Sequence, residues 1–355
     1  MLLPPIPTPE LDRDRSQLAH HPLITEALGS PVHLLHEGCS RSYAGKRVVM
    51  HAWLGPLPPV ATMDSELGIE VATPLFTLLT MAPSVSEYLL IMAMYELCGS
   101  FAVFQPSSMI ESLLQHAYAD RMLDASFGWR RMVSAAGRKT NLWERPPLIE
   151  IDELHEYAES IAGLRGAKQF ARAASAVSGI TASPLEVQAS MLLGMGRRRG
   201  GWGFRIANNI ELTMTRDARL ISGTRRRIAD IVITSEDGER CLIVECQGEA
   251  FHGSAEARVM DSDRTTALQS MGYQVIQVTY RQFRNEDTCA VLIGLIERPL
   301  GMGHHEKTRL QREREARLRS EIFLPWESFW ALQEQKEGQE IRNFRKTPSD
   351  IPSGE

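Results

Sequence analysis

Two apolar, β-branched runs joined by a short polar turn constrain the fold more than any other stretch of this chain. They cover residues 226–234 and 241–247, and the intervening Ser-Glu-Asp-Gly-Glu-Arg is typical of a hairpin turn. Each run carries one carboxylate, Asp230 in the first and Glu245 in the second. Because Asp is depleted in strands and a buried, unpaired carboxylate is costly, we expect these side chains to bind a partner or a cation.

The spacing within the second run adds a third polar group to this pair. Gln247 follows Glu245 by two residues, and the two-residue period of a strand puts both on the same face. Mg²⁺ takes oxygen ligands in proteins, often one or two carboxylates with water and phosphate. We therefore predict a site for Mg²⁺ or Mn²⁺ formed by Asp230, Glu245 and Gln247. An ordinary ion pair of Asp230 with Arg226 or Arg227 is the alternative.

The segments around the hairpin predict an α/β domain over residues 181–300. Its sheet should carry helices on its faces. In chain order, the expected elements are a helix from Pro184 to about Leu193, strands at 204–214, 227–234 and 240–247, a helix at 255–271, a strand at 273–280 and a helix at 288–297.

The flanking regions have a different character. Residues 1–180 predict a mainly helical α+β region, with short strands near 31–35 and 46–53 and helices that begin after Thr73 and within 84–87. A polar segment extends from about residue 119 to the Pro146-Pro147 break. Residues 301–355 predict a charged, solvated helix over 306–322 and a polar tail.

Length, net charge and cysteine spacing restrict the classes of protein to which this chain could belong. The 355 residues suggest two or three domains, and a formal charge of -5 argues against a uniformly basic nucleic-acid coat while allowing a local basic groove. The five cysteines are scattered, which argues against a zinc site or a disulfide framework and favours a reducing compartment. The N-terminus lacks the features of a signal peptide, and the most apolar run, 88–104, contains Glu96. We expect a cytoplasmic protein with no membrane partner.

Six short motifs occur in a particular order around the hairpin. In chain order they are Ser183-Pro184-Leu185-Glu186, Asp230, Glu245-Cys246-Gln247-Gly248, His252, Asp261-Ser-Asp-Arg264 and Gly272. This pattern resembles the PD-(D/E)XK nuclease superfamily, in particular the branch related to very short patch repair endonucleases. The resemblance covers about residues 181–282 and implies a restriction-endonuclease-like mixed sheet flanked by helices. It also implies a metal-dependent endonuclease that acts on DNA in defence or repair.

Each candidate residue has a chemical role in such a site. Asp230 and Glu245 would hold the ion, and Glu186 would bind a second ion or order a water. His252 would serve as general acid or base, and Arg264 would clamp a phosphate or stabilise developing charge. Gln247 stands where the family more commonly has Lys, and it cannot supply a positive charge.

Structural roles compete with these assignments. Glu186 lies at the position that a capping box after Ser183 requires, and Asp261 with Arg264 matches an ordinary surface pair on a helix. The Gln247 substitution also favours an alternative function. In that alternative the chain is a catalytically degenerate nuclease fold that acts as a nucleic-acid-binding or antitoxin-like regulatory protein.

Two basic triplets flank the hairpin in sequence. With Trp202 and Phe204, they predict a groove for phosphates and stacked bases, and solvated loop charge is the alternative. The predicted nucleic-acid-binding residues are Arg197, Arg198, Arg199, Arg225, Arg226, Arg227 and Arg264.

The N-terminal part, in which short strands are followed by residues 71–79, faintly resembles domains of abortive-infection antitoxins and their relatives. This resemblance implies no catalytic residue. Binding of a protein partner through this region is therefore a further hypothesis.

Overall fold

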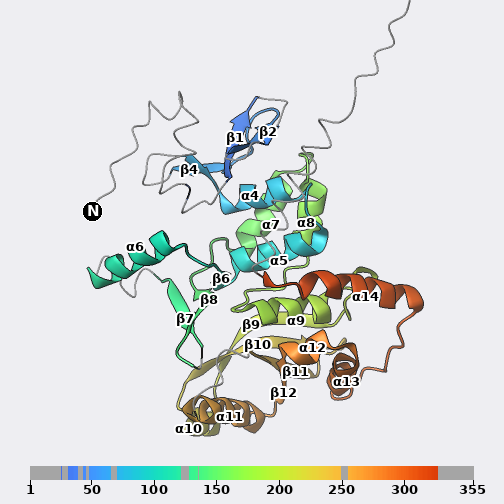
Figure 1. Cartoon of the computed structure of the whole chain (residues 1–355). Coiled ribbons are helices and arrows are strands. Elements are labelled where there is room, and N and C mark those ends of the chain that lie inside the picture. Colours follow the sequence, from blue (N-terminus) through green and yellow to red (C-terminus); the bar gives the residue numbers. More distant parts are fainter. Residues whose placement is uncertain are drawn as a thin grey trace, which may run out of the picture.

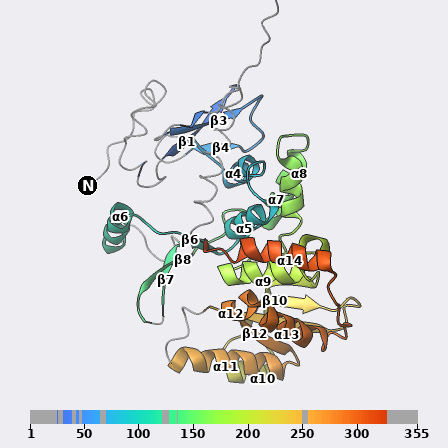
Figure 2. The ribbon, with the colours of Figure 1, turned by 45° about the vertical axis from the view of Figure 1, so that its right-hand side comes forward.

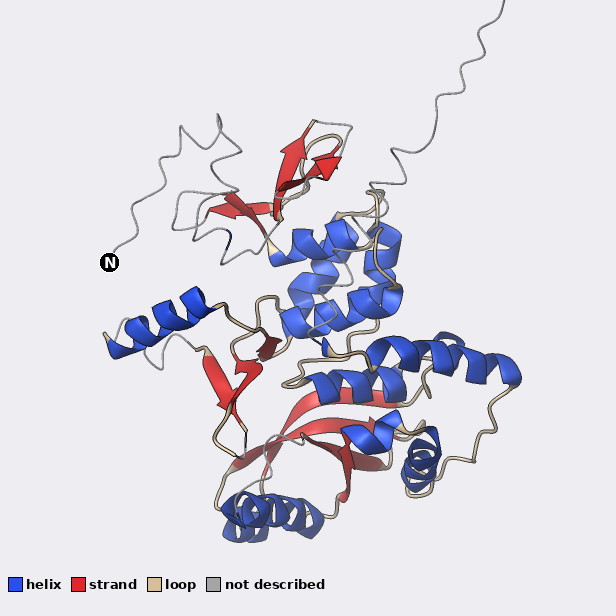
Figure 3. Ribbon diagram, in the orientation of Figure 1, coloured by secondary structure: helices blue, strands red, loops and turns tan. Residues whose placement is uncertain are grey.

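The computed structural model describes residue 25 and residues 31–38, 43–44, 48–64, 70–120, 128–134, 136–248 and 255–326, with only the backbone given for 43–44 and 255–261. Within these residues the chain is a mixed α/β protein with eleven helices and four separate sheets. Figures 1 and 3 show the largest sheet between two layers of helices, with a mainly helical half stacked on one of those layers.

The largest sheet is the one that the hairpin predicts. Its strands are β9 (Arg205–Thr213), β10 (Arg226–Thr234), β11 (Cys241–Gln247) and β12 (Gln274–Thr279). β9, β10 and β11 form an antiparallel meander, and β12 pairs parallel to β11, in the order β12-β11-β10-β9. The connection from β11 to β12 contains helix α11 (Ala255–Ser270), as a parallel crossover requires. The predicted order of helix, three strands, helix and strand is therefore confirmed.

Alternate residues of β11 divide the core between the two faces of this sheet. Leu242 and Val244 pack on the side of helix α9 (Pro184–Gly194), whereas Ile243 packs with Ala267 and Leu268 of α11. Helix α10 (Arg216–Ser222) completes the α11 side and was not expected. Its sequence does contain a cap at each end, because the Thr215 hydroxyl accepts from Ala218 N and Gly223 adopts a left-handed conformation.

The N-terminal half consists of small sheets and a helical layer (Figure 1). The Thr73 and Ser86 side chains cap helices α4 (Pro74–Met81) and α5 (Glu87–Cys98), which confirms both predicted helix starts. The expected polar segment before Pro146 instead contains the β7–β8 hairpin. The strands are β1 (Val32–Glu37), β2 (Tyr43–Ala44), β3 (Val48–Trp53), β4 (Thr62–Asp64), β5 (Glu70–Ala72), β6 (Phe101–Val103), β7 (Arg130–Val133) and β8 (Lys139–Glu144). The helices are α4 (Pro74–Met81), α5 (Glu87–Cys98), α6 (Ser108–Ala119), α7 (Ile151–Ser160) and α8 (Ala167–Ala174).

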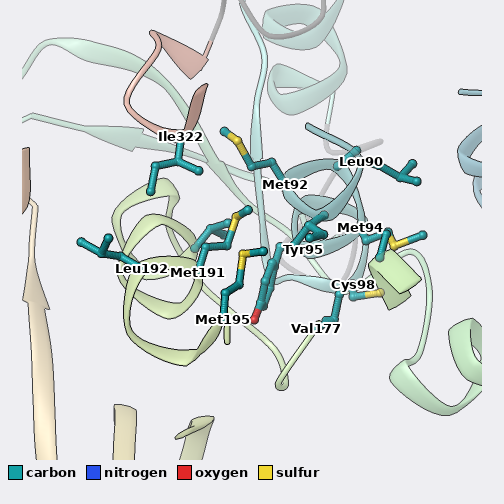
Figure 4. Packing of buried hydrophobic residues seen from close by; sticks show 14 of the residues in the cluster. Leu90, Met92, Met94, Tyr95, Cys98, Val177, Met191, Leu192, Met195 and Ile322 are labelled. Atoms are coloured by element: carbon teal, nitrogen blue, oxygen red, sulfur yellow. The ribbon is translucent and has the colours of Figure 1, made fainter. Parts of the chain in front are cut away.

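The last helices pack on the α/β sheet and on α5. They are α12 (Tyr280–Arg284), α13 (Glu286–Glu297) and α14 (Arg309–Ile322). Figure 2 shows α14 alongside α9, and Figure 4 shows Ile322 facing Met191, Leu192 and Met92. Leu318 and Ile322 are fully buried, so the expectation of a solvated α14 is wrong for one face. The larger of the two clusters of buried hydrophobic residues contains residues from Ala61 to Trp326, and the smaller one lies on the α11 side of the sheet.

The described residues bear on the expectations about membrane spans and cysteines. No described helix combines the length and the apolar character needed to cross a bilayer. Cys98, Cys241, Cys246 and Cys289 are all free thiols. The predicted polar tail beyond about residue 336 lies outside the described residues.

Because Ile322 fills space between α14, α9 and α5, its truncation should destabilise the whole chain. We expect Ile322→Ala to lower the free energy of unfolding by about 3 kcal/mol, through lost burial and a cavity. Urea unfolding followed by tryptophan fluorescence measures this change. Arg317→Ala, on the exposed face of the same helix, is the matched control and should change stability by less than about 0.5 kcal/mol. Equal effects of the two substitutions would show that α14 is not part of the core.

Candidate metal centre

The candidate site lies where β10 and β11 stop pairing. Their ladder extends from Thr234–Cys241 to Ile231–Val244, although β10 begins at Arg226 and β11 continues to Gln247. Asp230 is the β10 residue next to this last pair, immediately before Ile231 in the sequence. Its Oδ2 accepts a hydrogen bond from Cys246 N at 2.8 Å. The Asp230 side chain thus satisfies a β11 backbone amide at the point where the two strands diverge.

Two carboxylates converge at this point, as the hairpin predicts. Arg264 from α11 places Nη2 3.2 Å from Asp230 Oδ1 and 2.6 Å from Glu245 Oε2. The same nitrogen donates to Ile228 O at 2.6 Å. Oxygens from two strands therefore lie within bonding distance of one cationic atom. Arg264 is the ion-pair partner of Asp230, whereas Arg226 pairs with Glu211 at 3.1 Å.

The site is buried and electrostatically unfavourable for two negative charges. Glu245 is only 5% exposed, and its Oε1 has no hydrogen-bond partner among the described residues. Burial, and then the charge of Asp230, raise the pKa of Glu245 to about 7. Burial also raises the pKa of Asp230, although Arg264 and the Cys246 amide act in the opposite direction. The pair therefore favours a bound proton or additional positive charge.

Glu186 supplies a third carboxyl group from the first turn of α9. The Ser183 hydroxyl donates to Glu186 Oε1 at 2.9 Å, and Ala182 N donates to Oε2 at 2.7 Å. The structural alternative, a capping role, is thus confirmed, with the Ala182 amide in place of the Ser183 amide of a standard capping box. Burial, followed by the charge of Asp230, raises the pKa of Glu186 to about 8.

A buried polar network connects this turn to the N-terminal half and was not expected. Tyr95 Oη lies 2.8 Å from Ser178 Oγ, which donates to Asn208 Oδ1 at 2.5 Å. Asn208 Nδ2 donates to Ser190 Oγ, and Ser190 Oγ donates to Glu186 O, each at 2.6 Å. The network joins α5, β9 and α9. Its one sequence signal is an asparagine pair within a strand, because asparagine is depleted there.

The strand on the other side of Asp230 is irregular as well. Ala229 pairs with Ile210 and Ile231 with Asn208, but the intervening position is not paired. Asn209, opposite Asp230 in this register, has a φ of 55°. Asp230 therefore lies in a local break of the sheet on both sides.

Of the remaining predicted site residues, the structure describes the side chain of Gln247 but not those of His252 and Asp261. Gln247 is half-buried at the end of β11, two residues beyond Glu245. His252 lies outside the described residues, and the side chain of Asp261 does too. The expected Asp261–Arg264 surface pair is thus not tested, while Arg264 binds Asp230 and Glu245 instead.

The first arginine triplet does not join the site. Arg197, Arg198 and Arg199 form a short 3-10 helix, η2 (Arg197–Arg199), beyond the C-terminal end of α9. Glu186 lies in the first turn of α9, so the length of the helix, about 1.5 Å per residue, separates them. Arg199 pairs with Glu87. A groove with Trp202 and Phe204 is ruled out for stacking bases, because both rings are buried in the core.

The second triplet lies nearer to the carboxylates. Since β10 runs antiparallel to β11, Arg225, Arg226 and Arg227 lie at the same end of the sheet as Gln247. Arg225 and Arg226 are exposed. The pair between Arg226 and Glu211 is exposed on both sides and therefore contributes little to stability.

A cavity of about 560 Å³ adjoins the site on the α9 side. Glu186, Cys246 and Gly248 line it together with residues of β8 and of the chain after α14. Cys246 is the residue whose amide binds Asp230, so the cavity wall and the carboxylate pair share this segment of β11.

Comparison of the chain with protein-family models, curated proteins and solved structures found no match.

Within the described part of the chain, no group of three or more His, Cys, Asp or Glu side chains is arranged to hold a metal ion. The candidate site has two carboxylates that share one cationic partner, Asp230 and Glu245.

The raised pKa of Glu186 predicts a pH dependence of folding. Its pKa is about 8 in the folded chain and near the usual 4.5 when unfolded. The stability that the neutral form contributes is therefore complete below pH 4.5 and is lost as the pH rises through about 8. We expect Glu186→Gln, which keeps an acceptor for the cap, to reduce the loss of stability between pH 5 and 8.5 by at least about 1 kcal/mol. Urea denaturation at several pH values measures this difference.

The control for this experiment is Glu313→Gln, which removes an exposed carboxylate from α14. It should leave the pH dependence unchanged. An unchanged slope in the Glu186 variant would contradict the electrostatic account of the cluster.

Proposed function

We propose that the chain is a metal-dependent endonuclease that hydrolyses phosphodiester bonds, with DNA as the expected substrate. The observation that carries the proposal is the convergence of Asp230 and Glu245 on one point at the divergence of β10 and β11. The sheet around them is mixed and has helices on both faces, which supports the restriction-endonuclease-like fold that the sequence resemblance implies.

Two features of this point fit Mg²⁺ or Mn²⁺. Asp230 and Glu245 offer the hard oxygen ligands that these ions prefer, and Glu245 Oε1 is buried with no partner in the described chain. The raised pKa values of both carboxyl groups mean that added positive charge would be stabilising. Gln247, on the same strand face as Glu245, has a carbonyl oxygen that would complete the predicted set. A bound ion would polarise a phosphoryl oxygen and lower the pKa of an attacking water.

Arg264 has a positioning role in this proposal. Its guanidinium holds the two carboxylates toward each other and offsets their repulsion. Part of its charge would then be available to a phosphate once a cation shares the carboxylates. Arg225 and Arg226, exposed at the same end of the sheet, would contact the nucleic-acid backbone on either side.

A second candidate function rests on the same contact. Because Arg264 Nη2 already bridges both carboxylates, it satisfies part of the charge that a metal ion would otherwise neutralise. Gln247 in place of Lys also removes a cation from the site. The alternative is therefore a degenerate nuclease fold that binds nucleic acid without cutting it. Its signature is DNA binding that persists in EDTA, with no cleavage in Mg²⁺ or Mn²⁺.

Removal of one ligand charge should abolish cleavage without unfolding the chain. We expect Glu245→Gln, which preserves shape, to reduce the Mg²⁺-dependent nicking of supercoiled DNA by at least about 100-fold, the scale for loss of one preorganised charged group. Asp230→Ala should abolish it. Agarose-gel nicking assays with and without EDTA measure the activity, and circular dichroism verifies the fold. Undiminished nicking by either variant would refute the proposal.

The Arg264 contact should contribute to stability in a metal-dependent way. Arg264→Met leaves two buried carboxylates without their cation, so we expect a loss of about 3 kcal/mol in EDTA. Millimolar Mg²⁺ should restore part of this loss by binding the folded state. Urea unfolding with EDTA or Mg²⁺ measures both effects. Arg226→Met, which breaks an exposed pair, is the control, and an equal effect of the two substitutions would contradict the central role of Arg264.

A further inference from the structure

The cavity that Glu186 and Cys246 line is formed by three separate regions of the chain. Its lining includes Leu142 and Trp143 of β8, the first turn of α9 with the end of β11, and Tyr280 with the segment 324–326. The N-terminal half is therefore part of this binding space rather than a separate attachment.

The chemistry of the lining disfavours a phosphate. The lining includes three aromatic residues, Trp143, Tyr280 and Trp326, and the part of it that the structure describes contains no Lys or Arg. Both carboxyl groups in the lining already have partners, because Glu144 pairs with Arg130, and Glu186 accepts the hydrogen bonds of its helix cap. A volume of about 560 Å³ is within the range of small-molecule sites. A neutral, planar ring fits this environment.

One residue of the lining, Gln188, has a buried polar atom without a partner among the described residues. Gln188 is 4% exposed, and its Nε2 donates to Ile322 O at 2.8 Å. This bond orients the amide and leaves Oε1, for which the described residues provide no partner. A buried acceptor without a partner is costly, so a ligand that displaces the atoms covering Oε1 and offers it an N–H group would be favoured.

We propose that this cavity binds one unpaired nucleobase with an N–H donor, such as adenine or cytosine, from the nucleic acid that the candidate metal centre would cut. The inference rests on the proposed function for the nature of the ligand. Cys246 connects the two places, since it lines the cavity and its amide binds Asp230. A base inside a duplex cannot enter such a cavity, so the substrate is single-stranded or locally unpaired.

Binding measured without cleavage tests this proposal on the full-length chain. The probe is a labelled single-stranded oligonucleotide of about ten adenines, compared in EDTA with an abasic strand of equal length and charge. We expect the abasic strand to bind at least about 10-fold more weakly, because base stacking contributes strongly to single-strand binding. Fluorescence anisotropy gives both dissociation constants.

Two variants connect the effect to the cavity. Gln188→Met should weaken binding of the adenine strand several-fold and leave the abasic strand unchanged. Gln169→Met, which removes the same kind of bond to a backbone carbonyl, that of Val85, is the matched control and should change neither. Leu142→Phe fills the cavity from β8 and provides a second test should the Gln188 variant fold poorly.

The outcomes separate this proposal from the nuclease assignment. Equal affinity for adenine and abasic strands, or normal adenine binding by both cavity variants, would overturn the base site even if Mg²⁺-dependent cleavage is present. Failure to bind either strand would overturn it as well. Base-dependent binding that both cavity variants weaken, in a chain that cuts nothing, would support the cavity and refute the nuclease.

Discussion

One guanidinium group between two buried carboxylates is the interaction on which the rest of the site depends. Arg264 reaches Asp230 and Glu245 from α11, across the point where β10 and β11 separate. Without a cation, the two buried negative charges would repel each other. The pKa values of Asp230 and Glu245 are raised even with Arg264 present. The sheet can therefore hold this carboxylate pair only because α11 is packed against it.

The other face of the sheet is supported by residues far apart in the sequence. α9, which carries Glu186, is packed between the sheet and the helices α5 and α14. The Tyr95–Ser178–Asn208–Ser190 network connects the same helix to the N-terminal half. This dense packing fixes the first turn of α9 beside the cavity. It also explains why α14 buries Leu318 and Ile322 despite its many charges.

Local patterns predicted the elements of the fold better than the contacts between them. Strand alternation and the polar turn located β10 and β11, and the cap patterns at Thr73-Pro74 and within 84–87 located two helix starts. The β7–β8 hairpin was missed because its strands carry charged residues, which pair across the surface rather than in the core. The sequence predicts Arg264 as a group that clamps a phosphate or stabilises developing charge. Its bond to both carboxylates depends on how α11 packs, which sequence spacing does not determine. Trp202 beside an arginine triplet resembled a stacking residue, but the fold buries it beneath Lys307, whose Nζ lies 3.4 Å from the ring centre.

In the proposed function, Asp230 and Glu245 together hold a divalent ion. Isothermal titration of the full-length chain with Mn²⁺ tests it most directly, with Asp230→Asn and Glu245→Gln as paired variants. The account predicts saturable binding of Mn²⁺ in the unmodified chain that is lost in both variants, each of which retains its fold by circular dichroism. Absence of binding, or binding that both variants retain, would contradict it.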